Sequence, residues 1–179
     1  MATNSPYKAN SSTCCVDLQR YVPAYLTWTA SKLSRGASQC YLKYFDLGIE
    51  SWRCLVLLAI DGAISAPEIS RVTGMDKSCV SRCFKSMLEK GLIEFSVEHR
   101  QGRSRLAVLT EKGRDLHDQV RDVAMERERA FLEVLSKTEI DSLLRMFRKL
   151  HEHLPAVELA TQKFVVQRFS KRRSARGYA

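Results

Sequence analysis

The stretch VTGMDKSCVSRCFKSMLEKGL, residues 72–92, combines two cysteines, Cys79 and Cys83, with several lysine and arginine side chains. Two thiols could form a redox pair or bind a metal, whereas the cations could bind an anion such as the DNA backbone. A zinc site usually needs four nitrogen or sulfur ligands, and no histidine or acidic cluster accompanies these cysteines. We therefore expect packing cysteines. A thiol switch stays open, because Lys77 and Arg82 could stabilise a thiolate near a helix start.

A helical period runs through the same residues. The apolar positions recur on one helix face and are Val80, Cys83, Phe84, Met87 and Leu88. The opposite side carries short or cationic side chains: Ser78, Ser81, Arg82, Lys85 and Ser86. The pattern predicts a helix over residues 77–90 that is buried on one face. Because that face anchors the helix, the other face can present arginine to base edges and phosphates. The alternative is an ordinary solvated face.

A shorter helix is expected immediately before this one. Ser65 and Glu68 have the spacing of a capping box, Pro67 suits the first turn, and Gly74 is placed to end the helix. Asp76 then caps the next helix. Two helices joined by so tight a turn predict a helix-turn-helix.

After the second helix the apolar period changes from near 3.6 to 2. The alternating apolar residues are Ile93, Phe95 and Val97. Residues 105–109, RLAVL, make a return strand, and the polar residues 98–104 form the loop between them. Helix, turn, helix and hairpin predict a winged helix. Arg100 and Arg103 in that loop suit a narrow groove with negative potential, although exposed loop arginines are also common.

Long helices are expected on both sides of the winged helix. One covers residues 23–45 and a buried one covers residues 50–61. Thr110 can cap a very long helix, and Ser136 and Glu139 form another capping box before a near-heptad apolar pattern. A single small winged helix cannot cover this much apolar surface. The first helix and the last two therefore predict burial against a second copy of the chain.

The predicted fold class is mainly α with a small β-hairpin wing, a winged helix-turn-helix with long N- and C-terminal dimerisation helices. The expected organisation is a flexible N-terminal tail (1–16), an N-terminal dimerisation region (17–49), the winged helix-turn-helix DNA-binding domain (50–110), C-terminal dimerisation helices (111–154) and a basic C-terminal extension (155–179).

Composition narrows the function without choosing it. The net charge is +9, and much of the excess lies in residues 163–179, which permits an anionic partner. The N-terminus lacks a leader pattern and the longest apolar run, CLVLLAI, is too short for a bilayer, so the sequence predicts a soluble cytoplasmic protein without a membrane partner. The six cysteines form no disulfide framework. We find no motif for catalysis, a cofactor or a metal and predict none of these sites.

The order of elements and three strings resemble the MarR family of bacterial transcriptional regulators. The strings are SWRCLVLLA, SAPEISRVTGMDKSCVSRCFKSMLEKGLIE and RSRLAVLTEKG. The resemblance spans about residues 20–154. It implies a homodimeric winged-helix repressor that places one recognition helix per subunit in a major groove and a wing toward the minor groove.

The resemblance also implies contact residues. Ser78, Ser81 and Arg82 match the family's recognition-helix contacts, and Arg103 matches the wing arginine. The acidic residue that the family usually has two positions before that arginine is Gln101 here. With the cations read from the sequence, the full predicted DNA-binding set is Lys77, Ser78, Ser81, Arg82, Lys85, Arg100 and Arg103. The expected partner is double-stranded DNA with a pseudo-palindromic operator.

The expected trigger is a small molecule, because the resemblance implies a pocket between the dimerisation helices and the winged helix. Tyr25, Trp28 and Arg35 lie on one flank of the first predicted helix and could offer aromatic walls and a cation to an aromatic carboxylate or its thioester. The alternative is that both aromatic residues belong to a dimer core. Two competing functions stay open: a thiol-redox-responsive regulator, and a winged-helix protein-interaction module without specific DNA binding.

Overall fold

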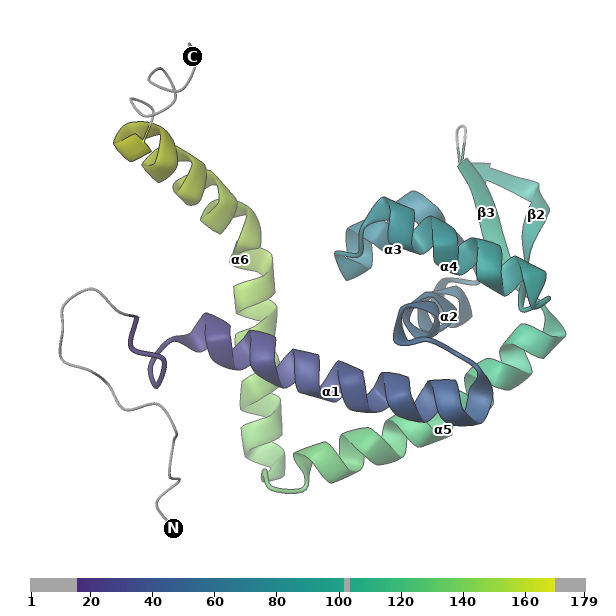
Figure 1. Ribbon diagram of the computed structural model, residues 1–179, viewed down its shortest axis with the longest axis horizontal. Coiled ribbons are helices and arrows are strands. Elements are labelled where there is room, and N and C mark those ends of the chain that lie inside the picture. The colour runs from purple at the N-terminus through teal and green to yellow at the C-terminus, as the bar shows by residue number, and fades with distance from the viewer. Residues whose placement is uncertain (1–15, 102–103, 170–179) are drawn as a thin grey trace, which may run out of the picture. The chain divides into compact units, whose positions relative to one another are not determined.

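The computed structural model describes residues 16–101 and 104–169 (Figure 1). For residues 97–101 and 104 it describes the backbone alone. Its elements, in chain order, are α1 (Val22–Phe45), α2 (Ile49–Asp61), β1 (Ala63–Ser65), α3 (Ala66–Thr73), α4 (Lys77–Glu89), β2 (Ile93–Gln101), β3 (Ser104–Leu109), α5 (Glu111–Leu132) and α6 (Lys137–Phe169). The predicted class, mainly α with a small β wing and a helix-turn-helix, is confirmed. The chain divides into two compact units between Glu126 and Arg127.

The small sheet has three strands in the order β1-β3-β2, all antiparallel. The sequence predicted only the last two, because β1 is three residues long and has no period of its own. It is defined by its partner: Ala63 pairs with Val108 and Ser65 with Leu106. The wing loop is also shorter than predicted, since β2 continues through residues 98–101 and Gln101 pairs with Ser104.

Local capping signals set the helix-turn-helix. The Ser65 hydroxyl accepts a hydrogen bond from the Glu68 backbone N–H at 3.4 Å, which is one half of the predicted capping box. The other half is wrong, because the Glu68 carboxylate pairs with the Arg71 guanidinium one turn later instead of the backbone at Ser65. Gly74 ends α3 at a φ of 71°, a conformation that suits glycine.

The core lies where α2, α3 and α4 meet the sheet and the C-terminal part of α1. Leu55, Leu58, Ile69, Val80 and Met87 are among its fully buried side chains. Burial of such a side chain contributes about 1.5–3 kcal/mol, so this cluster holds the three helices together. The core therefore holds the inner face of α4 in a fixed position.

The face of α1 that reaches this core differs from the predicted one. The helical period of the sequence puts Leu26, Leu33, Ala37, Cys40 and Tyr44 on one face. Ala37 is buried in agreement with that prediction, whereas Tyr44 is exposed and Tyr41 is buried instead. Leu26 and Leu33, predicted to share that face, are also exposed in the single chain. The difference arises because only the C-terminal part of α1 packs on the core, and the chain turns at Asp46 in a left-handed conformation.

A network of polar contacts joins α4 to α5. The Thr110 hydroxyl caps α5 by accepting from the Gly113 N–H at 3.0 Å, as predicted, and also donates to the Gly91 carbonyl at 2.8 Å. The Lys90 ammonium donates to the Asp46 carbonyl and carboxylate at 2.6 and 2.8 Å. These contacts fix the ends of α1 and α4 to the start of α5.

The helix α6 begins as predicted and ends later. Ser136 and Glu139 form a reciprocal capping box, with the carboxylate accepting from the Ser136 backbone N–H at 2.8 Å. The helix continues through Pro155 to Phe169, past residue 154, where the expected basic C-terminal extension begins. A proline removes one helical donor, but α6 has no buried residue, so water can satisfy the carbonyl left without its bond. In the described part of the chain, none of the helices combines the length and apolarity needed to span a membrane.

Candidate nucleic-acid interface

The helix α4 has two chemically distinct faces, as the sequence predicted. The inner face is buried and consists of Val80, Cys83, Phe84 and Met87. All five candidate contact residues that the sequence placed on this helix are exposed: Lys77, Ser78, Ser81, Arg82 and Lys85. The helix therefore presents a short-chained, cationic surface from a fixed base.

The first turn of α4 is held by Asp76. Its carboxylate accepts hydrogen bonds from the Ser78 backbone N–H at 2.8 Å and from the Ser78 hydroxyl at 2.7 Å. These bonds, with a smaller contribution from the charge of Arg82, lower the pKa of the Asp76 carboxyl. The carboxylate is thus ionised where the positive end of the helix favours an anion. Ser78 is oriented by this cap and still has a hydroxyl oxygen that can accept a bond.

The two cations farther along α4 differ in their surroundings. The Lys85 ammonium lies 4.0 Å from the Glu89 carboxylate, and both side chains are largely exposed. Such a pair contributes little and can exchange for a phosphate. Arg82 is exposed six residues after the cap at Asp76, and its planar guanidinium can form two parallel bonds to an acceptor pair.

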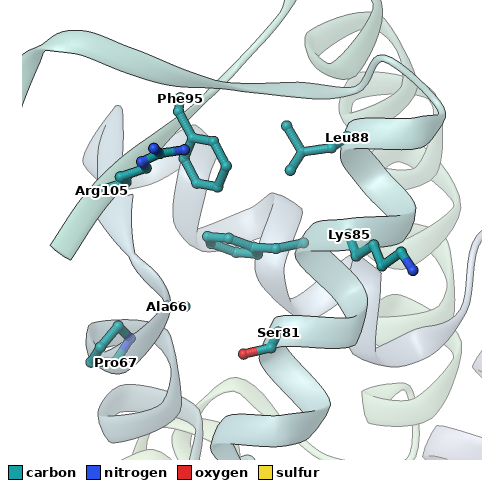
Figure 2. A pocket seen from close by; sticks show the side chains of 8 residues that line it. Ala66, Pro67, Ser81, Lys85, Leu88, Phe95 and Arg105 are labelled. Atoms are coloured by element: carbon teal, nitrogen blue, oxygen red, sulfur yellow. The ribbon is translucent and has the colours of Figure 1, made fainter.

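A groove separates α4 from the wing and has a volume of about 390 Å³. Its lining residues are Ala66, Pro67, Ser81, Phe84, Lys85, Leu88, Phe95 and Arg105. Figure 2 shows Ser81 pointing toward the start of α3, while the Lys85 ammonium extends away on the other side of α4. We call this the α4–wing groove. Its floor is mainly apolar and its rim is cationic.

Arg105 is a candidate contact residue that the sequence reasoning missed. Its guanidinium lies over the Phe95 ring, 5.6 Å from the ring centroid, and Figure 2 shows the two side chains side by side at the edge of the groove. Contact with an aromatic face restrains a guanidinium without neutralising it. The alternation of the strand could have indicated this placement. Arg105 is two residues before the buried Ala107, and residues two apart in a strand lie on the same face of the sheet.

The predicted wing contacts are only partly visible. The backbone of Arg100 pairs with that of Arg105, which places Arg100 on β2 near the hairpin end. Its side chain lies outside the described set, and Arg103 lies outside the described residues altogether. The structure therefore brings the α4 residues together and leaves the two wing arginines as predictions.

The cysteines of α4 pack as predicted. Cys83 is buried and Cys79 is half-buried, and Cys83 adjoins the fully buried Cys54 of α2. In the described part of the chain, no three His, Cys, Asp or Glu side chains are grouped so as to hold a metal ion.

The predicted effector residues lie on the exposed part of α1. The rings of Tyr25 and Trp28 are 6.4 Å apart and tilted by 54°, and Arg35 is exposed farther along the helix. Trp52 has a different setting, because it meets Tyr41 edge to face at 5.8 Å and stacks on His117 of α5 at 5.4 Å. That packing gives Trp52 a structural role beside the core.

Comparison with known proteins agrees with this architecture. The model of the MarR family matches residues 45–104, which cover the helix-turn-helix and most of the wing. A MarR/EmrR family transcriptional regulator from Acinetobacter sp. ADP1, known from its crystal structure, is 31% identical, and the alignment covers 79% of this chain and 99% of that one with a TM-score of 0.73. This chain belongs to the MarR family.

Two further relatives resemble this chain, one in sequence and one in fold. The HTH-type transcriptional repressor IacR of Pseudomonas putida is 26% identical over 113 residues, which are 63% of this chain and 68% of that protein. A putative MarR family transcriptional regulator from Listeria monocytogenes, solved in complex with 26mer DNA, is 20% identical. The alignment covers 79% of this chain and 94% of that one with a TM-score of 0.70, so this likeness concerns the fold.

Proposed function

We propose that this MarR-family protein is a repressor that binds a pseudo-palindromic DNA operator as a homodimer and is released by a small aromatic acid. The observation that carries the proposal is the two-faced α4: a buried inner face under an outer face that exposes Ser81, Arg82 and Lys85. A helix anchored in this way can enter a major groove without losing its position on the domain.

The proposed contacts divide by chemistry. Arg82 is the candidate for base recognition, since a guanidinium can bond the two major-groove acceptors of guanine. Lys77 and Lys85 supply phosphate contacts, and the serines permit close approach of the backbone. On the wing, Arg100 and Arg103 are proposed to meet the minor groove, whose narrow regions attract arginine. The Listeria relative, which has the same fold, was solved in complex with 26mer DNA, and this supports duplex DNA as the ligand.

Fluorescence anisotropy of the full chain tests DNA recognition. The labelled duplexes are fragments tiled across the DNA upstream of its own gene and scrambled versions of equal length. We expect one fragment to bind at least about 10³-fold more tightly than its scrambled version, with affinity falling steeply between about 50 and 200 mM salt. Equal binding to all fragments with a shallow salt dependence would contradict the proposal and favour the protein-interaction module.

The variant Arg82→Ala tests the base contact on the same operator. We expect affinity to fall about tenfold or more and discrimination at one base pair to relax, because a bidentate contact is worth about 1–3 kcal/mol. The control is Arg121→Ala on α5, which removes the same charge from a side chain held by Asp118 and Asp122. If both variants lose operator affinity equally, Arg82 contributes only through its charge and not through a base contact.

The proposed effector site uses the aromatic pair Tyr25 and Trp28 with Arg35. Exposed aromatic rings at this spacing can hold a ring, and the guanidinium can bind a carboxylate. Such a ligand releases DNA if it binds the non-operator conformation better, and a coupling of about 1–3 kcal/mol suffices.

Release of the operator by a panel of aromatic carboxylates tests this site. We expect Arg35→Ala to weaken the response at least about tenfold while operator affinity without ligand is unchanged, because one charged hydrogen bond is lost. The control is Lys43→Ala, a cation of the same helix that lies over Tyr44. An unchanged response in Arg35→Ala would remove this residue from the site.

A further inference from the structure

Arg105 lies where the sheet extends past the core toward the wing. Residues two apart in a strand share a face, so Arg105 of β3 is on the same face as Ala107, which is buried in the core. Phe95 of β2 pairs with Ala107, which makes Phe95 and Arg105 diagonal neighbours across the two strands. Arg105 is therefore on the core side of the sheet, yet it is exposed at the edge of the α4–wing groove.

The ring of Phe95 restrains the Arg105 side chain. The guanidinium carbon lies 5.6 Å from the centroid of the ring, and Figure 2 shows the two side chains next to each other. Phe95 itself packs against the core cluster, so the ring has a fixed position. An arginine loses rotamer freedom when it binds a ligand, and a side chain that is already held loses less. The contact leaves the positive charge available.

The charges around the α4–wing groove favour an anion. Among the described residues, its lining includes Lys85 and Arg105 and no carboxylate. No described carboxylate forms an ion pair with Arg105, whereas Arg71 and Arg121 are each paired with an acid of their own helix. A cation with an aromatic neighbour and no acidic one can form a charge-assisted hydrogen bond to an external anion.

The floor of the groove indicates which anion fits. It consists of the apolar side chains of Phe84, Leu88 and Phe95. A free inorganic anion gains nothing from this floor, whereas a DNA strand carries a deoxyribose beside each phosphate, and the carbon atoms of the sugar can pack on apolar side chains. Ser81 and Lys85 line the same groove and belong to the outer face of α4. The groove thus adjoins the surface proposed to meet DNA.

We propose that the α4–wing groove binds a stretch of the sugar–phosphate backbone of the operator, in which Arg105 contacts a phosphate and Phe95 positions its guanidinium. The proposal rests on the proposed function, because its ligand is the duplex that α4 is proposed to bind. It adds a contact at the base of the wing to those expected of Arg100 and Arg103. A phosphate contact carries no base information, so Arg105 acts on affinity for any duplex, whereas Arg82 acts on the choice of sequence.

Salt titrations of the full chain test the contact, with its operator and a scrambled duplex of equal length. In Arg105→Gln, which removes the charge, we expect affinity for both duplexes to fall by the same factor, about tenfold or more. The plot of log affinity against log salt is expected to lose about 1 unit of slope for each contacting subunit. An Arg105→Gln variant that keeps the wild-type slope would overturn the proposal.

The matched control is Arg121→Gln on α5. It removes the same charge from a side chain that is paired with Asp118 and Asp122. We expect this variant to keep the wild-type slope. A loss of slope equal to that of Arg105→Gln would show a general effect of net charge and would contradict a contact at Arg105.

A double-variant cycle tests the positioning role of Phe95. Phe95→Leu removes the ring and keeps an apolar floor, so we expect affinity to fall about twofold to fivefold in the wild-type background. In the Arg105→Gln background we expect no further loss, because the guanidinium is already absent. An equal loss in both backgrounds would show that Phe95 acts on the fold and not through Arg105. Phe95→Tyr, which keeps an aromatic face, is expected to lose less than Phe95→Leu.

Arg105→Lys tests the same step if Phe95→Leu does not fold. This variant keeps the charge, so the salt slope is expected to stay near that of the wild type. Its compact ammonium lacks the planar guanidinium that lies over the ring, so affinity is expected to fall at least about twofold. Full wild-type affinity in Arg105→Lys would show that the contact with Phe95 is not needed.

Neutral methylphosphonate groups, placed one at a time in the operator, locate the phosphate. We expect one position at which the neutral group weakens binding of the wild type but not of Arg105→Gln, since both changes remove the same contact. If every such position weakens both proteins equally, Arg105 contacts no phosphate.

Failure of the proposed function has a different signature. A chain that binds operator fragments and scrambled duplexes equally would contradict the proposed repressor, while the salt slope of Arg105→Gln on the scrambled duplex still decides the phosphate contact. A chain that binds no duplex at all would contradict both proposals.

Discussion

Cys83 is the residue of α4 at which core packing and a lowered thiol pKa coincide. It fills the buried stripe that the sequence predicted, and it also adjoins the thiols of Cys54 and Cys79. The sequence could predict the stripe because positions three and four apart share a helix face. It could not predict the third thiol, because Cys54 is 29 positions away and reaches Cys83 only through the packing of α2 on α4.

The pH dependence of alkylation tests the state of Cys83. Alkylation follows the thiolate, which forms above the pKa of the thiol. Since the pKa of Cys83 is lowered to about 6, we expect its rate with iodoacetamide to rise between about pH 5 and 7 and then level off. An ordinary thiol, with a pKa near about 8.5, continues to gain rate through pH 9. The measurement is peptide-resolved mass spectrometry of the full chain.

Cys40 of α1 provides the internal control for that experiment. It is a half-buried cysteine outside the group of Cys54, Cys79 and Cys83. Each pH point is normalised to the rate for free cysteine, so that changes in the reagent cancel. A Cys83 profile that still rises steeply above pH 8 would show that its thiol is not acidic.

At the scale of elements, the junction between α4 and α5 fixes how the recognition helix ends. Gly113 lies in the first turn of α5 against the backbone of Leu92, and the Thr110 hydroxyl binds both the Gly113 N–H and the Gly91 carbonyl. A Cβ atom at position 113 would overlap the Leu92 carbonyl group. The closeness of the two segments therefore depends on a glycine.

Gly113→Ala is expected to destabilise the protein, although the same change inside a free helix stabilises it by up to about 1 kcal/mol. The added methyl group must displace backbone, which costs about 1–3 kcal/mol. Urea unfolding followed by circular dichroism measures the difference. The neighbouring exposed substitution Arg114→Ala is the control, with an expected change within about 0.5 kcal/mol. A stabilised Gly113→Ala variant would contradict this account of the junction.

The same elements show which features were predictable. The caps at Asp76, Thr110 and Ser136 could be predicted because each acts within three residues of itself. The short strand β1 could not, because it exists only through pairing with β3. Glu68 was misassigned because Arg71 competes for its carboxylate with a charge-assisted pair. The error at β1 comes from a partner far away in the sequence, whereas the error at Glu68 comes from a competing partner only three residues away.

At the scale of the whole molecule, α6 carries exposed apolar residues that a subunit interface could cover. The helix has no buried residue, although it carries exposed leucines, valines and phenylalanines along its length. The predicted DNA contacts need two recognition helices at a fixed separation to read two half-sites. A second copy of the chain would meet both requirements, because a two-fold interface buries the same surface on each subunit.

We therefore expect sedimentation equilibrium to give twice the chain mass of 20.4 kDa. The double variant Leu150→Glu with Leu154→Glu places two carboxylates among the exposed apolar residues of α6. Desolvating an unpaired charge is costly, so this variant is expected to shift toward the monomer mass and to lose at least about tenfold in operator affinity. The control Lys149→Glu with His153→Glu adds carboxylates to the same helix without replacing an apolar side chain.

The fluorescence of Trp52 distinguishes loss of assembly from loss of folding. Trp52 packs between Tyr41 and His117, away from α6 in sequence, and reports on the core of residues 1–126. In the leucine double variant we expect its emission and its urea transition to persist while the mass halves. A variant that remains a dimer with full operator affinity would show that these two leucines lie outside the subunit interface. The dimer would then have to be built from other exposed apolar residues, such as Tyr25 and Trp28 of α1, and the proposed effector site would be the first to be reassigned.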